Sequence, residues 1–207
     1  MLFFYNNDFM FNFDKYREIR DFLLKSDKNC EIVAISKNHP KETVIEALNH
    51  GVRVFGENRV MEAKLKFSDL KNKYSKIKLH LTGPLQSNKV KEAVSLFDVF
   101  HTLDREKIAK EFSKYKDKMK SKKIFVQVNT GEEETKSGIV PKDLNEFIFF
   151  CQNEIEIKIS GLMCIPPIYE KPEKHFSMLD KLAKENQINE LSIGMSGDYV
   201  NALNYNP

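Results

Sequence analysis

Short runs of β-branched and aromatic residues alternate along the chain with longer stretches in which apolar residues recur at helical spacing. Seven such runs predict strands, at 31–36, 52–55, 78–82, 98–102, 123–129, 155–163 and 190–195. Helical patterns lie at 14–26, before the first predicted strand, and between strands at 41–51 and 144–153. Strands that alternate with helices favour a parallel sheet covered by helices.

Seven strands in this order are one fewer than the eight of a (β/α)₈ barrel. We therefore predict an α/β, TIM-like barrel with the eighth strand missing from this chain, which would then be truncated at its C-terminus. At 207 residues the barrel would be compact, since the fold typically takes about 250. Without an internal repeat or linker, residues 1–207 are expected to form a single domain, with an N-terminal extension and helix at 1–28.

Composition and charge narrow the class of protein. The formal net charge is only +3, and basic and acidic residues are interleaved, so nucleic acid is not an expected partner. The basic cluster Lys110–Lys123 is interpreted as the solvated face of a helix. No stretch reaches the roughly 20 apolar residues that span a bilayer, and the aromatic start lacks the features of a signal peptide. Three scattered cysteines suit the reduced thiols of a cytoplasmic protein. We predict a monomer.

Lys37 is the first candidate for chemistry. Alternation along the first predicted strand puts Val33, Ile35 and Lys37 on one face. A lysine at the carboxyl end of a barrel strand lies where the active sites of barrels lie, and its amine can attack an aldehyde. Position alone leaves an equal alternative, in which the side chain extends to solvent along its apolar stem.

Polar residues also follow other strands. Gly56 would let the backbone approach a ligand closely, and Asn58 would bind a cofactor oxygen or cap the next helix. Ser87 is a candidate helix cap. After the seventh strand, Ser196 and Gly197 open a short helix and predict a phosphate cradle made of free amides.

Three further features concern the phosphate site and the exclusion of nucleotide and metal sites. Asp198 would repel a phosphate and is expected to turn toward backbone amides or a basic neighbour. The run 131–137 lacks the glycine before the lysine of a nucleotide-binding loop. The five histidines have no ligand spacing, so no metal site is predicted.

Several blocks taken together resemble the pyridoxal phosphate homeostasis protein family. These blocks are Ala34-Ile35-Ser36-Lys37, Phe55-Gly56-Glu57-Asn58, the run from His80 to Lys89, and Met195-Ser196-Gly197-Asp198, with Gln127-Val128-Asn129 and Gly161-Leu162-Met163 between them. The resemblance extends from about Glu31 to the end of the chain.

The resemblance implies a barrel similar to the N-terminal domain of alanine racemase, with pyridoxal 5′-phosphate (PLP) held as a Schiff base on Lys37. It also implies Asn58 close to the cofactor, and Ser196 and Gly197 at its phosphate. The family pattern continues beyond Pro207 into an Arg-x-Gly-Thr segment on an eighth strand, which faces the pyridine nitrogen and completes the phosphate site. Family members are described as carriers of PLP that do not turn over a substrate, with apo PLP-dependent enzymes as candidate recipients.

Two alternatives stay open at this point. One is a weak PLP-dependent amino-acid racemase, with Tyr199 or His80 as the base, because racemisation needs an acid and a base on opposite faces of the cofactor. The other is a barrel that binds phosphate or acts as a scaffold without PLP. Lys89 and Lys136, on loops expected at the same barrel face, are assigned no role.

Overall fold

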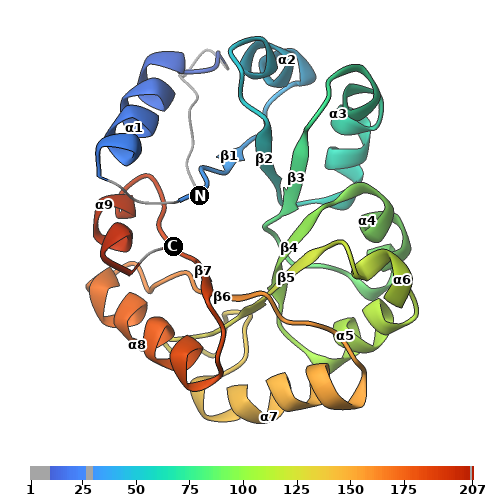
Figure 1. Cartoon of the computed structure of the whole chain (residues 1–207), viewed down its shortest axis with the longest axis vertical. Coiled ribbons are helices and arrows are strands. Elements are labelled where there is room, and N and C mark those ends of the chain that lie inside the picture. The colour runs from blue at the N-terminus through green and yellow to red at the C-terminus, as the bar shows by residue number, and fades with distance from the viewer. Residues whose placement is uncertain (1–9, 27–29, 206) are drawn as a thin grey trace.

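Seven parallel strands lie side by side in chain order in the computed structural model, which describes residues 10–26, 30–205 and 207. The strands are β1 (Ala34–Ile35), β2 (Val54–Glu57), β3 (Lys78–Leu81), β4 (Val99–Leu103), β5 (Lys123–Gln127), β6 (Gly161–Met163) and β7 (Glu190–Ser192). Each strand pairs with the next, which leaves β1 and β7 as the two edges. Figure 1 shows this curled sheet inside a ring of helices. The fold is the predicted TIM-like barrel, with no eighth strand among the described residues.

Helices connect successive strands and cover the outside of the sheet. They are α1 (Phe13–Lys25), α2 (Lys41–Asn49), α3 (Val60–Lys73), α4 (Val90–Leu96), α5 (Glu106–Ser113), α6 (Lys116–Met119), α7 (Leu144–Phe149), α8 (Pro172–Glu185) and α9 (Tyr199–Ala202). The prediction at 41–51 is confirmed, and the chain leaves α2 through Gly51 at a left-handed φ of +88°. The prediction at 144–153 is confirmed in part, because α7 continues as a π-helical turn over Phe150–Glu154.

Two strands are much shorter than their hydrophobic runs predict. The run 31–36 forms a strand only at Ala34–Ile35, although the Ser36 amide also donates to Gly56 O at 2.9 Å. Among the described strands, β1 is an edge strand with β2 as its one partner. The run 155–163 pairs only at Gly161–Met163. Ahead of that strand Glu156 adopts a φ of +57° and the Ile157 amide donates to Cys151 O. The chain therefore closes the preceding helical turn before it enters the sheet.

The main core lies between the strands and the helices. Phe55 of β2 contacts Phe67 of α3 with ring centroids 5.4 Å apart, and Phe100 of β4 meets Phe112 of α5 at 4.9 Å. All four rings are fully buried. Burial of a side chain of this size stabilises a fold by about 1.5–3 kcal/mol, so these pairs fix each helix against its strand.

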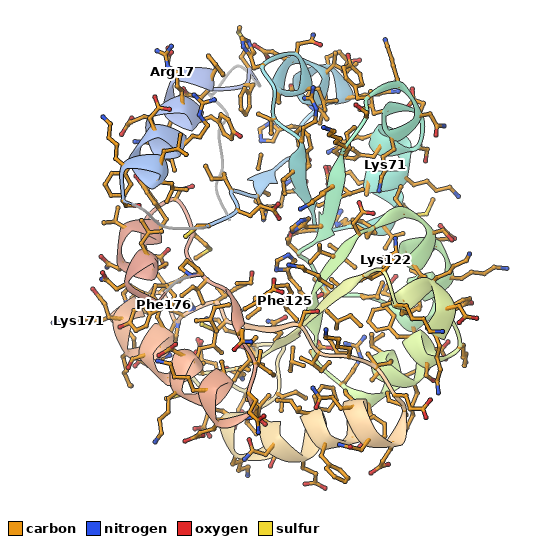
Figure 2. All side chains as sticks on the ribbon, in the orientation of Figure 1. Arg17, Lys71, Lys122, Phe125, Lys171 and Phe176 are labelled. Carbon is orange, nitrogen blue, oxygen red and sulfur yellow. The ribbon has the colours of Figure 1, made fainter. Side chains whose placement is uncertain are left out.

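A second, smaller apolar cluster lies inside the barrel. Val99, Phe125 and Met163 form it, and the ring of His101 stacks on Phe125 at 4.8 Å between centroids. Figure 2 shows Phe125 pointing into the space enclosed by the strands. Val99, His101 and Phe125 also line the cavity described next, so this cluster packs one part of the barrel interior and leaves another part open.

The two edge strands border a cavity of about 1070 Å³. Val33, just ahead of β1, and Leu191 of β7 both line it, as do Ile19 and Leu23 of α1. Outside this seam, α1 and α9 lie side by side in Figure 1, and the ring of Phe22 meets that of Tyr199 edge-on at 6.5 Å. The seam is the place that an eighth strand would take in a closed barrel.

The basic residues on the surface are mostly paired with nearby acidic residues. In the basic cluster Lys110–Lys123, Lys110 pairs with Glu106 at 2.6 Å and Lys114 pairs with Glu111 at 2.6 Å, both on exposed helix faces. This cluster is a solvated helix surface, as predicted. Within the described residues, no helix has the length and apolar character needed to cross a membrane.

Candidate functional site

The four predicted cofactor residues all follow strands at the carboxyl edge of the sheet. Lys37 is half-buried in the turn after β1, and Asn58 comes directly after β2. Ser196 and Gly197 lie in an exposed turn after β7. Because all strands are parallel, their carboxyl ends meet at one face of the barrel, where active sites of this fold are built.

The turn that carries Lys37 has a defined geometry. The amide of His39 donates to Ser36 O at 3.2 Å, so residues 36–39 form a tight turn with Lys37 and Asn38 at its centre. Asn38 adopts a left-handed φ of +62°, a conformation that asparagine tolerates better than most residues. Its amide donates to Glu62 Oε1 at 2.6 Å. The lysine therefore projects from a backbone with bonds on both sides of it.

Gly56 does not leave room for a ligand. A Cβ built there would lie 2.5 Å from Ile35 Cδ1 and 3.0 Å from Val33 Cγ1. Val33 and Ile35 thus lie on one face of the first strand, as predicted, and their side chains fill the space above Gly56. Its small size serves packing inside the barrel.

Asn58 is oriented by a hydrogen bond from Thr82, the residue directly after β3. Its Oδ1 accepts a hydrogen bond from Thr82 Oγ1 at 2.9 Å. Arg59, not Asn58, is the residue that caps α3, and no side-chain bond closes that cap. A Cβ on Gly83 would lie 2.4 Å from Asn58 O, so this glycine is required for the close approach of the two loops. Ser87 likewise does not cap its helical turn, since Gln86 occupies that place.

The turn after β7 differs from the predicted cradle of free amides. The amides of Asp198 and Tyr199 both donate to Met195 O, at 3.1 and 2.9 Å. Asp198 turns its Oδ1 to the Met195 amide, as expected, and so faces away from the exposed turn. A Cβ on Gly197 would meet nothing within 4 Å. Two exposed residues, Ser196 and Gly197, and the open space beside Gly197 are what this turn offers to a ligand.

Behind Lys37, on the helix side of the sheet, lies a buried charge cluster that the sequence did not reveal. Lys66 of α3 donates from Nζ to Ser36 O at 2.7 Å, to Glu57 Oε1 at 2.8 Å and to Glu62 Oε1 at 2.7 Å. Ser36 Oγ donates to the same Glu57 oxygen at 2.6 Å. We refer to Lys66, Glu57 and Glu62 as the Lys66 cluster. The available signal was the spacing of Glu62 and Lys66, four residues apart on one helix.

The two carboxylates of this cluster respond differently to it. Burial raises the pKa of Glu57, and the hydrogen bonds from Lys66 and Ser36 oppose that rise only in part. For Glu62, burial also acts to raise the pKa, but the bonds from Lys66 and Asn38 outweigh it and the pKa is lowered. Glu62, which accepts the amide next to Lys37, is therefore the more firmly ionised of the two.

His80, one of the candidate bases, lies deeper in the barrel. It precedes Thr82 by two residues, which places it one layer below the carboxyl edge. Its Nδ1 lies 2.9 Å from His101 Nε2, and its Nε2 lies 3.6 Å from Glu31 Oε2, ahead of β1. His101 Nδ1 in turn lies 2.7 Å from Ser192 Oγ. Burial lowers the pKa of His80 to about 4 and that of His101 well below its usual value.

The remaining candidates are engaged elsewhere. Tyr199 packs at the seam against Phe22. Lys136 pairs with Glu133 at 2.6 Å, and Lys89 lies 3.6 Å from Glu92. In the part of the chain that the structure describes, no three potential metal ligands come together. In the run 131–137, Asn129 holds the loop through bonds to Glu133 N and O.

Comparison with known proteins agrees with this arrangement. The family model described as alanine racemase, N-terminal domain, matches residues 14–206. The pyridoxal phosphate homeostasis protein of Aquifex aeolicus (strain VF5) is 36% identical over 188 residues, which cover 85% of this chain and 81% of that protein. The chain belongs to the pyridoxal phosphate homeostasis protein family.

Solved structures extend the likeness to the fold. PipY of Synechococcus elongatus PCC7942, in its structure with PLP bound, matches this chain with a TM-score of 0.79 and 29% identity over 93% of each chain. Its structure without PLP gives a TM-score of 0.80 and 32% identity, over 91% of this chain and 93% of that one. An alanine racemase of Clostridium difficile 630 has a TM-score of 0.69 at 13% identity, over 91% of this chain and 51% of that one, a likeness of fold alone.

Proposed function

We propose that this protein binds pyridoxal 5′-phosphate through a Schiff base on Lys37 and takes part in the homeostasis of the cofactor. The observation that carries the proposal is the turn at 36–39, which presents a half-buried lysine at the carboxyl edge of the barrel. Membership of the family, and the PLP bound to the related PipY, support the choice of ligand.

The other residues at this edge suit the same ligand. Asn58 is oriented by Thr82 and could donate its amide to an oxygen of the cofactor. Ser196 and Gly197 would receive the phosphate at a turn where nothing crowds the backbone, and Asp198 keeps its carboxylate bonded to Met195. We therefore propose Lys37, Asn58, Ser196 and Gly197 as the cofactor-binding residues.

We further propose that the protein carries the cofactor without turnover. Bound PLP supplies an electron sink for reactions at the α-carbon of amino acids, but such chemistry also needs positioned acids and bases. His80 points toward the opposite end of the barrel, and Tyr199 packs at the seam. The curated relatives are named for homeostasis, which also favours a carrier over a racemase.

The proposal extends to the domain organisation, oligomeric state, location and partners of the protein. Residues 1–207 would form one domain, since all described strands belong to one sheet. We propose a monomer in the cytoplasm, where Cys30, Cys151 and Cys164 would stay reduced, as they are free thiols in the structure. The partners would be PLP and the apo forms of PLP-dependent enzymes.

An absorption spectrum tests the proposal. The purified protein, with PLP added, is expected to show a Schiff-base band that disappears in Lys37→Ala. The band should persist in the control Lys41→Ala, which alters a half-buried lysine four residues away that pairs with Asp69. A protein that stays colourless with added PLP contradicts the proposal and favours a scaffold barrel. Sustained change in the optical rotation of L-alanine, lost in Lys37→Ala, contradicts the carrier role and favours the racemase.

A further inference from the structure

The Lys66 cluster contacts the backbone on both sides of Lys37. On one side, Lys66 Nζ lies 2.7 Å from Ser36 O, the same oxygen that accepts the turn-closing bond from His39. On the other side, Glu62 Oε1 accepts the amide of Asn38 at 2.6 Å. Lys66 and Glu62 are themselves bonded at 2.7 Å. A continuous set of charge-assisted bonds therefore joins the two peptide groups that flank the reactive lysine.

Burying these charged side chains costs folding free energy, which suggests that the geometry they fix is useful. The side chains of Lys66 and Glu57 are 8% and 0% exposed, and Glu57 Oε2 has no hydrogen-bond partner. Buried ion pairs seldom add more stability than apolar side chains of similar size would, whereas they can specify one geometry. The Lys66 cluster also lies on the far side of the sheet from the barrel interior, since Glu57 is outward between Gly56 and Asn58.

We propose that Lys66, with Glu57 and Glu62, is a positioning cluster that sets the affinity for PLP by fixing the turn of Lys37 from behind. The inference rests on the proposed function, because it concerns the same lysine. Lys66 does not touch the cofactor in this account; it acts through Ser36 and, by way of Glu62, through Asn38. Small displacements of a reacting group cost affinity and rate steeply, so loss of the cluster should weaken Schiff-base formation.

The chain offers a matched control on the same helix. Lys71 of α3 also bonds a carbonyl and a carboxylate, with Nζ 2.9 Å from Leu96 O and 2.6 Å from Asp98 Oδ2. Those partners lie ahead of β4, at the opposite end of the barrel from Lys37. Figure 2 labels Lys71, on α3. Lys66→Met and Lys71→Met therefore remove similar interactions, and only the first acts on the cofactor turn.

The experiment is a titration of each apo protein with PLP, followed through the Schiff-base band, together with the pH dependence of that band. Lys66→Met is expected to raise the Kd for PLP by about tenfold or more and to shift the pH profile of the band. Lys71→Met should stay within about twofold of wild type even where its melting temperature falls. A Kd and pH profile of Lys66→Met that match wild type overturn the inference.

A second variant covers the case in which Lys66→Met does not fold. Glu62→Ala removes the acceptor of the Asn38 amide but leaves the buried pair of Lys66 and Glu57 in place. It is expected to raise the Kd by about threefold or more, whereas Asp69→Ala, an exposed site on the same helix, should leave it unchanged. Equal values for the two overturn the inference. A wild-type protein without any band contradicts the proposed function itself, so the two failures are distinguishable.

Discussion

The turn after β1 and the turn after β7 lie at the two edges of the same sheet, yet the chain holds them in opposite ways. In the first turn, Lys66 Nζ donates to Ser36 O and Glu62 Oε1 accepts the amide of Asn38, both from the helix side of the sheet. The second is closed by bonds between Met195 and Asp198, and it exposes Ser196 and Gly197. The difference indicates that the described chain fixes the turn of Lys37 more strongly than the turn proposed to bind the phosphate.

The largest expected effect is on the β1 side. Lys66→Met leaves Glu57 buried without its cation, which should lower the free energy of unfolding by about 3–5 kcal/mol. Adding Glu57→Gln removes the unpaired charge and should restore part of that loss. Urea unfolding of both variants measures the values. A double variant no more stable than the single one would show that the buried pair is not what holds this turn.

Acid should loosen the β7 side. The pKa of His80 is lowered from 6.5 to about 4 by burial, so the unfolded chain binds a proton in this window that the folded chain does not. Stability therefore falls as pH drops from about 6.5 to 4, by up to about 3 kcal/mol for this residue. Because His101 joins Ser192 of β7 to β4, protonation of the pair should open β7 first.

Hydrogen exchange followed across this pH range checks that order. The amide of Leu191 in β7 should lose protection before that of Phe55 in β2, whose strand lies beside the Lys66 cluster. His80→Gln should flatten the pH dependence of unfolding. Equal loss of protection in the two strands would contradict the contrast between the edges.

Gly83→Ala should have an intermediate effect. The added methyl group would lie 2.4 Å from Asn58 O, so the loops after β2 and β3 must separate. We expect a loss of about 1–3 kcal/mol in the free energy of unfolding, with weaker PLP binding as Asn58 shifts. Thermal unfolding and the PLP titration measure the two effects, and wild-type values in both would remove Asn58 from the site.

Gly197→Ala should have the smallest effect on stability. A methyl group there meets nothing within 4 Å, so the free energy of unfolding should stay within about 0.5 kcal/mol of wild type. A drop in PLP affinity in this folded variant would show that the phosphate approaches the β7 turn closely. Unchanged affinity would indicate that the turn takes no part in binding.

Much of this architecture was predictable from the sequence. Hydrophobic runs that alternate with helical patterns were sufficient for the strand order, and the alternation in the first strand correctly placed Val33 and Ile35 on one face. Strand lengths were overestimated at 31–36 and 155–163. Pairing depends on a neighbouring strand and on the turn at Glu156, and neither is visible in a hydrophobic pattern.

The proposed cofactor residues Lys37, Asn58, Ser196 and Gly197 could be named from the sequence because they lie in polar turns after predicted strands. They stay a prediction. The Lys66 cluster could not be named, because its contact with Ser36 joins residues 30 positions apart through the helix side of the sheet. The turn after β7 was expected to offer free amides to a phosphate, but it uses the amides of Asp198 and Tyr199 to bond Met195.

The most direct test of the central claim is to find where PLP attaches. The full-length protein is incubated with PLP, reduced with borohydride, digested and mapped by peptide mass spectrometry. The account predicts a single phosphopyridoxyl group on Lys37, with Lys66, Lys89 and Lys136 unmodified. A stable adduct on another lysine, with Lys37 unmodified, would contradict it.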